Sequence, residues 1–308
     1  VEAWDGGAAV KGVLTPVGGG EEPGRRILEW LAAEDELILL MVYSLRDITA
    51  PGFTGSLVDV VAERVGAGVP VLIVTDRKQS DGYWDTTEDE LRAAGATVWE
   101  VTNAATPYTA MHHKVAVLGT TDVRVITDAS NWTKSGLGSA SEEASNVESV
   151  LFLDTSALDG GRTGRRYLAR FARVLDRYRD QLEEDGEPGY DAAFGALLAQ
   201  PGWPLQPVEF IAGEAYTNWG EMVYVRGDLF ELGVWGHEGP GHPLNTDAAS
   251  YPTWSSTEAA MIPLGAPFEW KFVAADEASG DTRWEAGGNH RDRAEPPVLV
   301  ATDATTLQ

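Results

Sequence analysis

The sequence predicts an α/β domain followed by an all-β sandwich domain, and three observations carry this prediction. The chain has 308 residues, enough for two domains of ordinary size, and 43% of them are hydrophobic, which suffices for two cores. In the first part of the chain, short apolar runs alternate with amphipathic stretches. After a proline-rich stretch, aromatic residues alternate with polar ones between Gly and Pro turns.

The first part of the chain reads as strands and helices in turn. Short apolar runs predict buried strands, and apolar residues at three- and four-residue steps predict helices. The predicted helices cover residues 24–34, 55–67, 87–95, 163–184 and 190–199, and the predicted strands cover residues 36–45, 69–75, 96–101, 112–118, 122–127 and 147–153. Such alternation is typical of a mostly parallel sheet between helices. One β-hairpin is expected around residues 119–122.

The long helix predicted at 163–184 carries two stripes of side chains. Its apolar stripe, which includes Leu168 and Phe171, is expected to face the core. The second stripe consists of Arg162, Arg166, Arg170, Arg173 and Arg177. We interpret this arginine stripe as a solvated face that neighbouring carboxylates balance, and a local anion-binding strip is the alternative.

A stiff linker is predicted between the two domains, because residues 200–207 contain three prolines. We therefore divide the chain into an α/β domain at 1–185, a short helix and proline-rich linker at 186–206, and a β-sandwich at 207–308. The composition also excludes some site types. The chain has no cysteine, which rules out disulfides and thiolate metal sites, and we predict neither a metal nor a cofactor.

The charge balance narrows the possible partners. The formal net charge is -25 at pH 7. Such a chain repels polyanions at long range, so we do not expect nucleic acid as an electrostatically steered partner. No apolar run approaches ~18 residues, so no membrane span is predicted.

A histidine and a lysine stand two residues apart at the start of the strand predicted at 112–118. Alternate residues of a strand share a face, so His112 and Lys114 are expected to point the same way. His113 is expected to point the other way, as a buried and hydrogen-bonded ring. Breaking a phosphodiester requires a nucleophile for phosphorus and positive charge on the non-bridging oxygens. His112 and Lys114 supply both.

Three further polar residues complete this candidate catalytic site. Asn131 is expected to donate to the phosphate oxygens, as is Ser130 if its hydroxyl turns inward. Glu148 is expected to accept the N–H of the His112 imidazole and so fix its tautomer. The predicted catalytic set is therefore His112, Lys114, Asn131, Glu148 and Ser130.

The order of these residues resembles the motif of the phospholipase D superfamily, and the resemblance covers roughly residues 10–185. That motif runs His-x-Lys, four residues, Asp, about six residues and Gly-Ser-x-Asn, and a downstream Asn-x-Glu is echoed at 146–148. Two positions depart from it. Gly119 stands where the motif has Asp, and Ala129 stands where it has Ser, with Asp128 in the Gly position.

The resemblance implies a metal-independent phosphodiester hydrolase. Its mechanism needs two histidines, one that attacks phosphorus and one that protonates the leaving oxygen and later activates water. This chain has five histidines but a single His-x-Lys. The resemblance therefore implies a homodimer in which the two copies of His112 meet.

The aromatic residues of the second domain are spaced like a carbohydrate-binding surface, because sugar rings stack their flat faces on indole and phenol rings. The segments that carry the pattern are 232–235, 268–272, 284–285 and 288–289. They resemble the starch-binding modules of carbohydrate-binding module family 20, over about residues 207–297.

This second resemblance implies two glucan-binding surfaces. Surface 1 consists of Trp235, Lys271, Trp284, Glu285 and Asn289. Surface 2 consists of Trp219, Tyr251 and Trp254. The residues expected in the core are Phe210, Tyr224, Phe230, Trp270 and Phe272. The chain departs from the family after the asparagine, where His290 replaces the usual arginine.

The sequence thus predicts a phosphodiesterase that a starch-binding module tethers to α-1,4-glucan such as starch, glycogen or maltooligosaccharide. We expect it to be secreted with its signal peptide removed, mainly because of the predicted glucan binding. Residue 1 is Val rather than Met, which indicates a processed or trimmed N-terminus. The alternative, which Gly119 and Ala129 favour, is a non-catalytic glucan-binding protein with a degenerate phospholipase-D-like dimerisation domain. A glycosidase with paired carboxylates ranks third. Phospholipid, nucleic acid and phosphorylated glycan all contain the bond that this site would cut.

Overall fold

The chain divides in the computed structural model into two compact units, Val1–Trp203 and Pro204–Gln308, termed unit 1 and unit 2 below. The structure describes residues 8–15, 23–80, 86–102, 110–137, 146–181, 189–237, 239–276, 278–295, 299–304 and 307. Residues 186–188 of the predicted linker lie outside the described residues, and residues 189–203 belong to unit 1.

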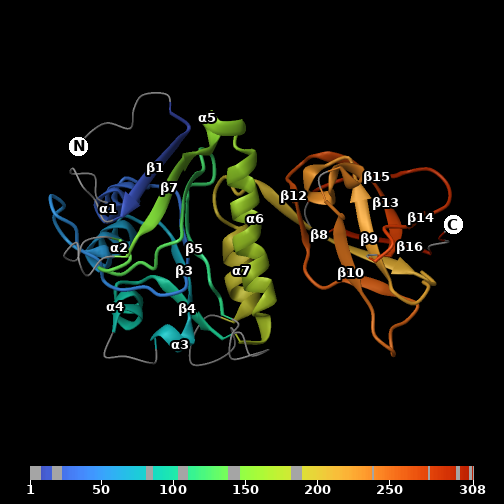
Figure 1. The fold of residues 1–308 in the computed structure, drawn as a ribbon, viewed down its shortest axis with the longest axis horizontal. Helices are drawn as coiled ribbons and strands as arrows, with labels where there is room; N and C mark the ends of the chain where they lie inside the picture. The colour runs from blue at the N-terminus through green and yellow to red at the C-terminus, as the bar shows by residue number, and fades with distance from the viewer. Residues whose placement is uncertain are drawn as a thin grey trace. The chain divides into compact units, whose positions relative to one another are not determined.

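Unit 1 is built on one seven-stranded sheet with the order β1-β7-β6-β5-β2-β3-β4 (Figure 1). The strands are β1 Val10–Thr15, β2 Ile38–Val42, β3 Val71–Asp76, β4 Thr97–Val101, β5 Lys114–Leu118, β6 Arg124–Asp128 and β7 Glu148–Asp154. Every strand predicted in this part of the sequence has a counterpart. The edge strand β1 is an element that the apolar pattern does not predict, because half of its residues are exposed.

The prediction of a mostly parallel sheet is wrong. In the described sheet of unit 1, β3 pairs in parallel with β2 and β4, and the other neighbouring pairs are antiparallel. A parallel neighbour needs a crossover of about a dozen residues, whereas a short turn joins β5 to β6. The α/β class holds, and the sheet is mixed.

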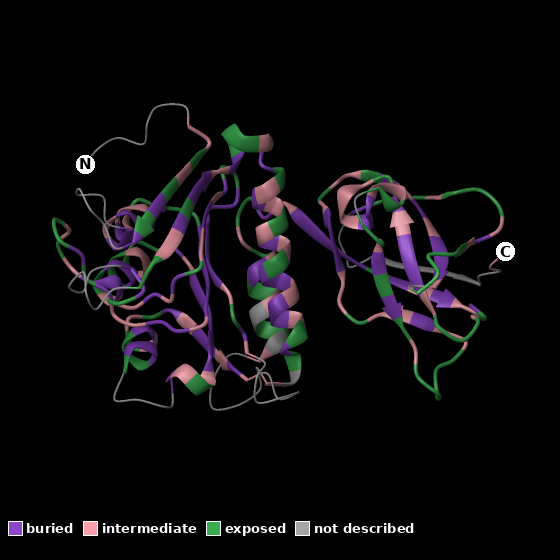
Figure 2. Ribbon diagram, in the orientation of Figure 1, coloured by how far each residue is buried: buried purple, intermediate pink, exposed green. Residues whose placement is uncertain are grey.

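Helices cover both faces of this sheet (Figure 1). They are α1 Pro23–Ala32, α2 Leu57–Gly66, α3 Arg77–Ser80, α4 Thr87–Ala93, α5 Thr155–Asp159, α6 Arg162–Arg177 and α7 Tyr190–Leu198. Ile38 and Leu40 of β2 share a buried cluster with Leu28 of α1 and Val61 of α2. On the opposite face, α6 packs against β5 and β6. Figure 2 shows that the central strands between these helix layers are buried.

Helix α6 is shorter than the 163–184 predicted for it. It ends at Arg177, and a 3-10 turn at Arg179–Gln181 follows. Leu168 and Phe171 are buried, as the apolar stripe predicts. Most of the arginine stripe is exposed, in agreement with a solvated face.

Unit 2 confirms the all-β prediction. Its nine strands form one curled sheet, with the path β12-β8-β11-β10-β9-β13-β14, to which β15 adds at β13 and β16 at β8. The strands are β8 Leu205–Gly213, β9 Glu221–Gly227, β10 His242–Asn245, β11 Trp254–Ser256, β12 Ala260–Pro263, β13 Pro267–Asp276, β14 Thr282–Trp284, β15 His290–Arg293 and β16 Leu299–Ala304. Phe210, Tyr224, Trp270 and Phe272 are buried as predicted, and Phe230 is half-buried. None of the helices in the described parts of the chain combines the length and the apolar character needed to cross a membrane.

Candidate functional site

Three of the five predicted catalytic residues, His112, Lys114 and Glu148, lie at one end of the sheet of unit 1. Together with Tyr43 and Asp128, which the motif does not assign, they form a group termed the His112 cluster. Lys114 opens β5, Asp128 closes β6 and Glu148 opens β7. Because β6 runs antiparallel to both neighbours, these three residues lie at the same end of the sheet. The parallel strands β2 and β3 also end there, and in open α/β sheets ligands bind outside the carboxyl ends of such strands.

The side chains of His112 and Lys114 touch. Lys114 Nζ lies 3.0 Å from Nδ1 and 3.1 Å from Nε2 of His112. The Tyr43 ring packs beside them, with its centroid 4.4 Å from that of the imidazole and 5.3 Å from Nζ. His112 is exposed and Lys114 is buried beneath it. The structure therefore presents an imidazole to solvent with an ammonium group directly behind it.

His113 points to the other face of the sheet, as strand alternation predicts. Its Nε2 accepts a hydrogen bond of 3.3 Å from Arg170 Nε of α6. Arg170 therefore contacts a neighbouring side chain and is not only part of a solvated face. A cavity of about 140 Å³ lies here, lined by Ala110, Met111, His112, His113, Arg170, Val174, Arg177 and Tyr178. Two residues of the arginine stripe thus stand beside the histidine pair.

Burial and neighbouring charge shift the pKa values in the His112 cluster. Burial lowers the pKa of His112, Lys114 lowers it further, and the Asp76 carboxylate opposes both. Burial also lowers the pKa of Lys114, against the opposing effects of Asp128 and Glu148. The lowered pKa of His112 favours the neutral imidazole, which has a lone pair for attack.

Asp128 belongs to this cluster, although its role does not follow from the motif. Its Oδ2 accepts a hydrogen bond of 3.1 Å from Trp132 Nε1, and its buried Oδ1 has no hydrogen-bond partner within the described residues. Burial raises the pKa of Asp128 to about 8. Val115 pairs with Thr127, so the register places Asp128 opposite Lys114. The register of the predicted hairpin determines which residues of its two strands face each other. The sequence could therefore have identified Asp128 as the partner of Lys114 across the strands.

Ser130 does not fulfil its expected role. Its side chain is fully buried and its Oγ has no hydrogen-bond partner among the described residues, so the hydroxyl is not available to a bound phosphate. Asn131 is half-buried, and its buried Oδ1 likewise has no partner in the described parts of the chain. The loop that follows β6 therefore buries the two polar groups that the sequence assigns to phosphate binding, and only Asn131 retains exposed surface.

Glu148 acts on the lysine rather than on the histidine. Its Oε1 accepts a hydrogen bond of 3.3 Å from Asn146 Nδ2. No hydrogen bond joins Glu148 to His112 within the described residues, whereas Glu148 is one of the two carboxylates that favour the charged form of Lys114. The expected tautomer-fixing contact is absent there, and Asp76 is the carboxylate that acts on His112.

Surface 1 of unit 2 is formed by two indoles. The ring centroids of Trp235 and Trp284 lie 6.3 Å apart, with an angle of 44° between the ring planes. Trp235 sits in a left-handed turn, with φ of 56°, between Val234 at 45° and Gly236 at 94°. A left-handed backbone at a non-glycine residue costs ~1–2 kcal/mol, so the surrounding loop must hold this turn in place. The two half-buried rings form a fixed aromatic corner.

Of the three polar residues of surface 1, Lys271 and Asn289 are at least partly exposed, whereas Glu285 is buried. Lys271 Nζ donates to the carbonyl oxygens of Glu285 and Gly287, at 2.8 Å and 2.7 Å. Asn289 is exposed and donates to Glu269. Glu285 is a correction: its side chain is buried and its carboxylate accepts the N–H of Phe272 at 3.1 Å. Glu285 therefore connects strands of the core and does not face a ligand.

Surface 2 presents tyrosine and tryptophan to solvent. Trp219 is fully exposed and Tyr251 is 44% exposed. The assignment of Trp254 to surface 2 is also corrected. This residue is 5% exposed, and its indole N–H donates to the carbonyl oxygen of Ala215. Tyr216 is a residue that the motif misses, since it is 64% exposed and its ring centroid lies 6.2 Å from that of Tyr251.

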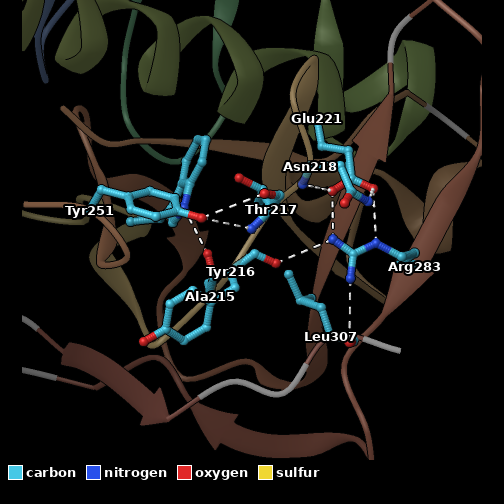
Figure 3. A network of polar contacts seen from close by, with 9 residues as sticks. Ala215, Tyr216, Thr217, Asn218, Glu221, Tyr251, Arg283 and Leu307 are labelled. Carbon is cyan, nitrogen blue, oxygen red and sulfur yellow. Dashed lines mark hydrogen bonds and ion pairs between the residues drawn. The ribbon is translucent and has the colours of Figure 1, made fainter. Parts of the chain in front are cut away.

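A polar network fixes the loop that carries surface 2 (Figure 3). Arg283 donates to both carboxylate oxygens of Glu221, at 2.8 Å and 2.5 Å, and to the carbonyl oxygen of Tyr216. Asn218 donates to the same carboxylate from its backbone and its side chain. The hydrogen bonds from Arg283 lower the pKa of Glu221 to about 2. Tyr251 is tied to the same loop through its hydroxyl, which accepts from the backbone N–H of Thr217.

Residues 206–296 match the protein family described as "Starch binding domain", and this segment contains all residues of surfaces 1 and 2. Residues 206–296 form a starch-binding domain. The resemblance predicted for about 207–297 is confirmed. The starch-binding domain accounts for most of unit 2, whose remaining described strand, β16, pairs with β8.

Two similar enzymes match this chain over a segment that is only a small part of their own length. The cyclomaltodextrin glucanotransferase of Geobacillus stearothermophilus is 37% identical over 84 residues, which are 27% of this chain and 11% of the relative. The glucan 1,4-alpha-maltotetraohydrolase of Roseateles saccharophilus is 34% identical over 93 residues, 29% of this chain and 16% of the relative. The solved family 20 CBM of the maltotetraose-forming amylase from Pseudomonas saccharophila STB07 is 30% identical, covers 31% of this chain and 98% of that structure, and has a TM-score of 0.27. The chain thus spans less than a fifth of these two relatives.

Proposed function

We propose that the chain binds α-1,4-glucan through its starch-binding domain. The observation that carries this proposal is that the matched segment 206–296 holds aromatic rings at two places, half-buried at surface 1 and exposed at surface 2. Sugar rings stack on such faces, and polar groups at their edges accept and donate hydrogen bonds to the hydroxyls. Starch, glycogen and maltooligosaccharides are the ligands that fit this chemistry, and an extracellular location fits such polymers.

The two surfaces take different parts in binding. At surface 1 the corner of Trp235 and Trp284 holds one sugar ring, and Lys271 and Asn289 contact its hydroxyls. At surface 2 the exposed rings of Trp219 and Tyr251 act as an open platform. Two surfaces on one domain bind a polymer with greater avidity than either does alone, provided that the polymer spans both.

Adsorption to granular starch tests this proposal. We expect the full chain to adsorb, and the double variant Trp219→Ala/Trp235→Ala to lose adsorption by at least about tenfold, which corresponds to ~1.4 kcal/mol. The matched control is Leu264→Ala, since Leu264 is an exposed apolar residue of unit 2 outside both surfaces. Equal adsorption of the double variant and the control would contradict the proposal.

We further propose that unit 1 hydrolyses a phosphodiester through His112. The supporting observation is an exposed imidazole in contact with the ammonium group of Lys114. In the first step an imidazole nitrogen of neutral His112 forms a bond to phosphorus while the bond to the leaving oxygen breaks. In a homodimer the second copy of His112, in its protonated imidazolium form, donates a proton to that oxygen and becomes neutral. The same imidazole then removes a proton from water, which attacks phosphorus and releases His112.

The residues around His112 have distinct parts in this reaction. Lys114 stabilises the charge that develops on the phosphate oxygens, and Asn131 donates to them from the rim of the site. The carboxylate of Glu148 favours the charged form of the buried lysine. The phospholipase-D-like assignment of unit 1, the homodimer and the secreted location are parts of this proposal.

Turnover of bis(p-nitrophenyl) phosphate tests the catalytic proposal. We expect slow release of p-nitrophenol by the full chain and a loss of at least about a thousandfold in His112→Ala, because the nucleophile is removed. His237→Ala is the matched control, since His237 is an exposed histidine of unit 2. Sedimentation of the parent is expected to give the mass of two chains.

One group of observations favours a non-catalytic protein instead. Ser130 is buried, Gly119 and Ala129 replace motif residues, and His112 has no hydrogen bond to Glu148 within the described residues. In that case unit 1 serves as a scaffold and glucan binding is the whole function. An absence of turnover in the parent, together with starch adsorption, would establish this alternative.

A further inference from the structure

An arginine that no motif identifies lies against surface 1. Arg226 belongs to β9 and stands directly opposite Lys271 of β13. Its Cζ is 5.6 Å from the centroid of the Trp284 ring, and its Nε donates to the carbonyl oxygen of Pro240 at 2.9 Å. Residues that face each other on neighbouring strands share one side of the sheet, so two cations flank the same indole.

Neither cation is neutralised within the described residues. Arg226 and Lys271 form no ion pair there, and the hydrogen bonds of Lys271 end on carbonyl oxygens. The nearby carboxylate of Glu269 is already paired with Arg291 at 2.9 Å. The chain as a whole carries a formal net charge of -25. Surface 1 is therefore a cationic spot on an acidic protein, whereas uncharged glucan requires no such charge.

The hydrogen-bonding capacity of Arg226 also remains open on one side. Its Nε donates to Pro240, while its Cζ lies 5.6 Å from the centroid of the Trp284 ring. A guanidinium presents five N–H donors in a planar fork, a shape that matches the oxygens of a phosphate or carboxylate. The side chain is also packed under the loop of Trp235, since a Cβ at Gly236 would lie 3.2 Å from Arg226 Nη1. The fork is thus pre-positioned beside the aromatic corner.

We propose that surface 1 selects α-glucan that carries an anionic substituent, and that Arg226 recognises the anion while Trp235 and Trp284 hold the sugar. This inference rests on the proposed glucan binding by unit 2. A phosphate ester is the substituent that the ammonium group of Lys271 and the guanidinium fork of Arg226 fit best.

Calorimetric titration of the full chain with two probes tests the inference. The probes are maltohexaose and maltohexaose carrying a 6-phosphate. We expect the phosphorylated probe to bind roughly tenfold more tightly at low ionic strength, and this preference to shrink at high salt as screening increases. Maltohexaose with a terminal glucuronate distinguishes charge alone from phosphate geometry: tighter binding of both anionic probes assigns charge, and tighter binding of the phosphate alone assigns the fork.

Two variants distinguish recognition of the anion by Arg226 from its support of the loop that carries Trp235. In Arg226→Gln we expect the preference for phosphate to vanish while the affinity for maltohexaose stays within about threefold. Arg226→Lys keeps the charge but not the fork, so it is expected to retain part of the preference. An equal affinity of the parent for both probes, or a preference that survives in Arg226→Gln, overturns the inference. If maltohexaose itself fails to bind, the proposed function fails as well, and the two failures are therefore distinguishable.

Discussion

Surface 2 and the His112 cluster expose opposite kinds of groups. At surface 2 the aromatic faces of Trp219 and Tyr216 point to solvent, and the charged pair of Arg283 and Glu221 lies behind them as a support. In the His112 cluster the lysine is buried, its two neighbouring carboxyl groups are half-buried, and the ring that reaches solvent is the imidazole. A binding platform needs shape and exposure, whereas a reactive centre needs charges whose pKa values the protein has shifted.

This difference determines what a substitution does in each place. Truncating an exposed ring removes contact area with the ligand and leaves the core untouched. Removing a buried charge or a buried ring changes stability, pKa values or both. The predictions below compare exposed and buried residues. A result opposite to the one expected for any of them would contradict this difference between the two regions.

The largest effect is expected from the buried tryptophan of surface 2. Trp254→Ala should lower the free energy of unfolding by about 3–5 kcal/mol, because it opens a cavity among Phe210, Trp270 and their neighbours. Chemical denaturation followed by fluorescence measures this. A stability within ~0.5 kcal/mol of the parent, combined with lost glucan binding, would restore Trp254 as a binding residue.

Trp219→Ala is the matched counterpart with an intermediate effect. The indole is fully exposed, so stability should remain within ~0.5 kcal/mol of the parent. Affinity for maltoheptaose at surface 2 should fall by about tenfold, since a stacking face is lost. Titration in a Trp235→Ala background isolates this surface. Unchanged affinity there would show that Trp219 is an ordinary exposed side chain.

Much of the fold follows from the sequence, and the limits have physical causes. The buried runs of β2 and β3 and the periodicity of α6 place those elements correctly. The sheet direction does not follow, because an apolar run is equally suited to parallel and antiparallel neighbours and the short turn between β5 and β6 decides between them. In the starch-binding domain, motif spacing locates Trp219 and Trp254 alike, and only the packing of the strands shows that one is exposed and the other is core.

The candidate catalytic site is predictable to a similar degree. Strand alternation places His112 and Lys114 on one face and His113 on the other. The burial of Ser130 and the electrostatic effect of Glu148 on Lys114 depend on how the loop after β6 folds, and no local pattern encodes that fold. Asp128 is identified by register rather than by motif, because its position opposite Lys114 follows from the β5–β6 pairing.

A smaller effect is expected at Asp128, and it depends on pH. The pKa of Asp128 in the folded protein is about 8, above the ordinary 3.8, so the folded state holds its proton more tightly than the unfolded state. Stability from this group is therefore lost as pH rises from about 3.8 to about 8. Asp128→Asn keeps an acceptor for Trp132 and removes the titration. Its Tm should exceed that of the parent by roughly 5 °C at pH 8 and equal it at pH 4. Parallel pH profiles for the two proteins would contradict this assignment.

The smallest effect is expected at Glu221. The pKa of Glu221 is lowered from 4.5 to about 2 by Arg283, so the stability from this pair is present above pH 4.5 and is lost as the pH falls toward 2. Glu221→Gln should cost at most about 1 kcal/mol at pH 7 and should flatten the acid limb of the stability profile. Glu209→Gln, at an exposed carboxylate of the same unit, is the control. Identical acid limbs in both variants would remove Glu221 from the support of surface 2.

The central claim is that two exposed aromatic surfaces of the starch-binding domain hold α-glucan. Isothermal titration of the full chain with maltoheptaose tests it most directly. The account predicts two binding sites per chain, of which Trp235→Ala removes one and Trp219→Ala removes the other. Titration of the parent without a binding isotherm, or binding that survives in the double variant, would contradict the account.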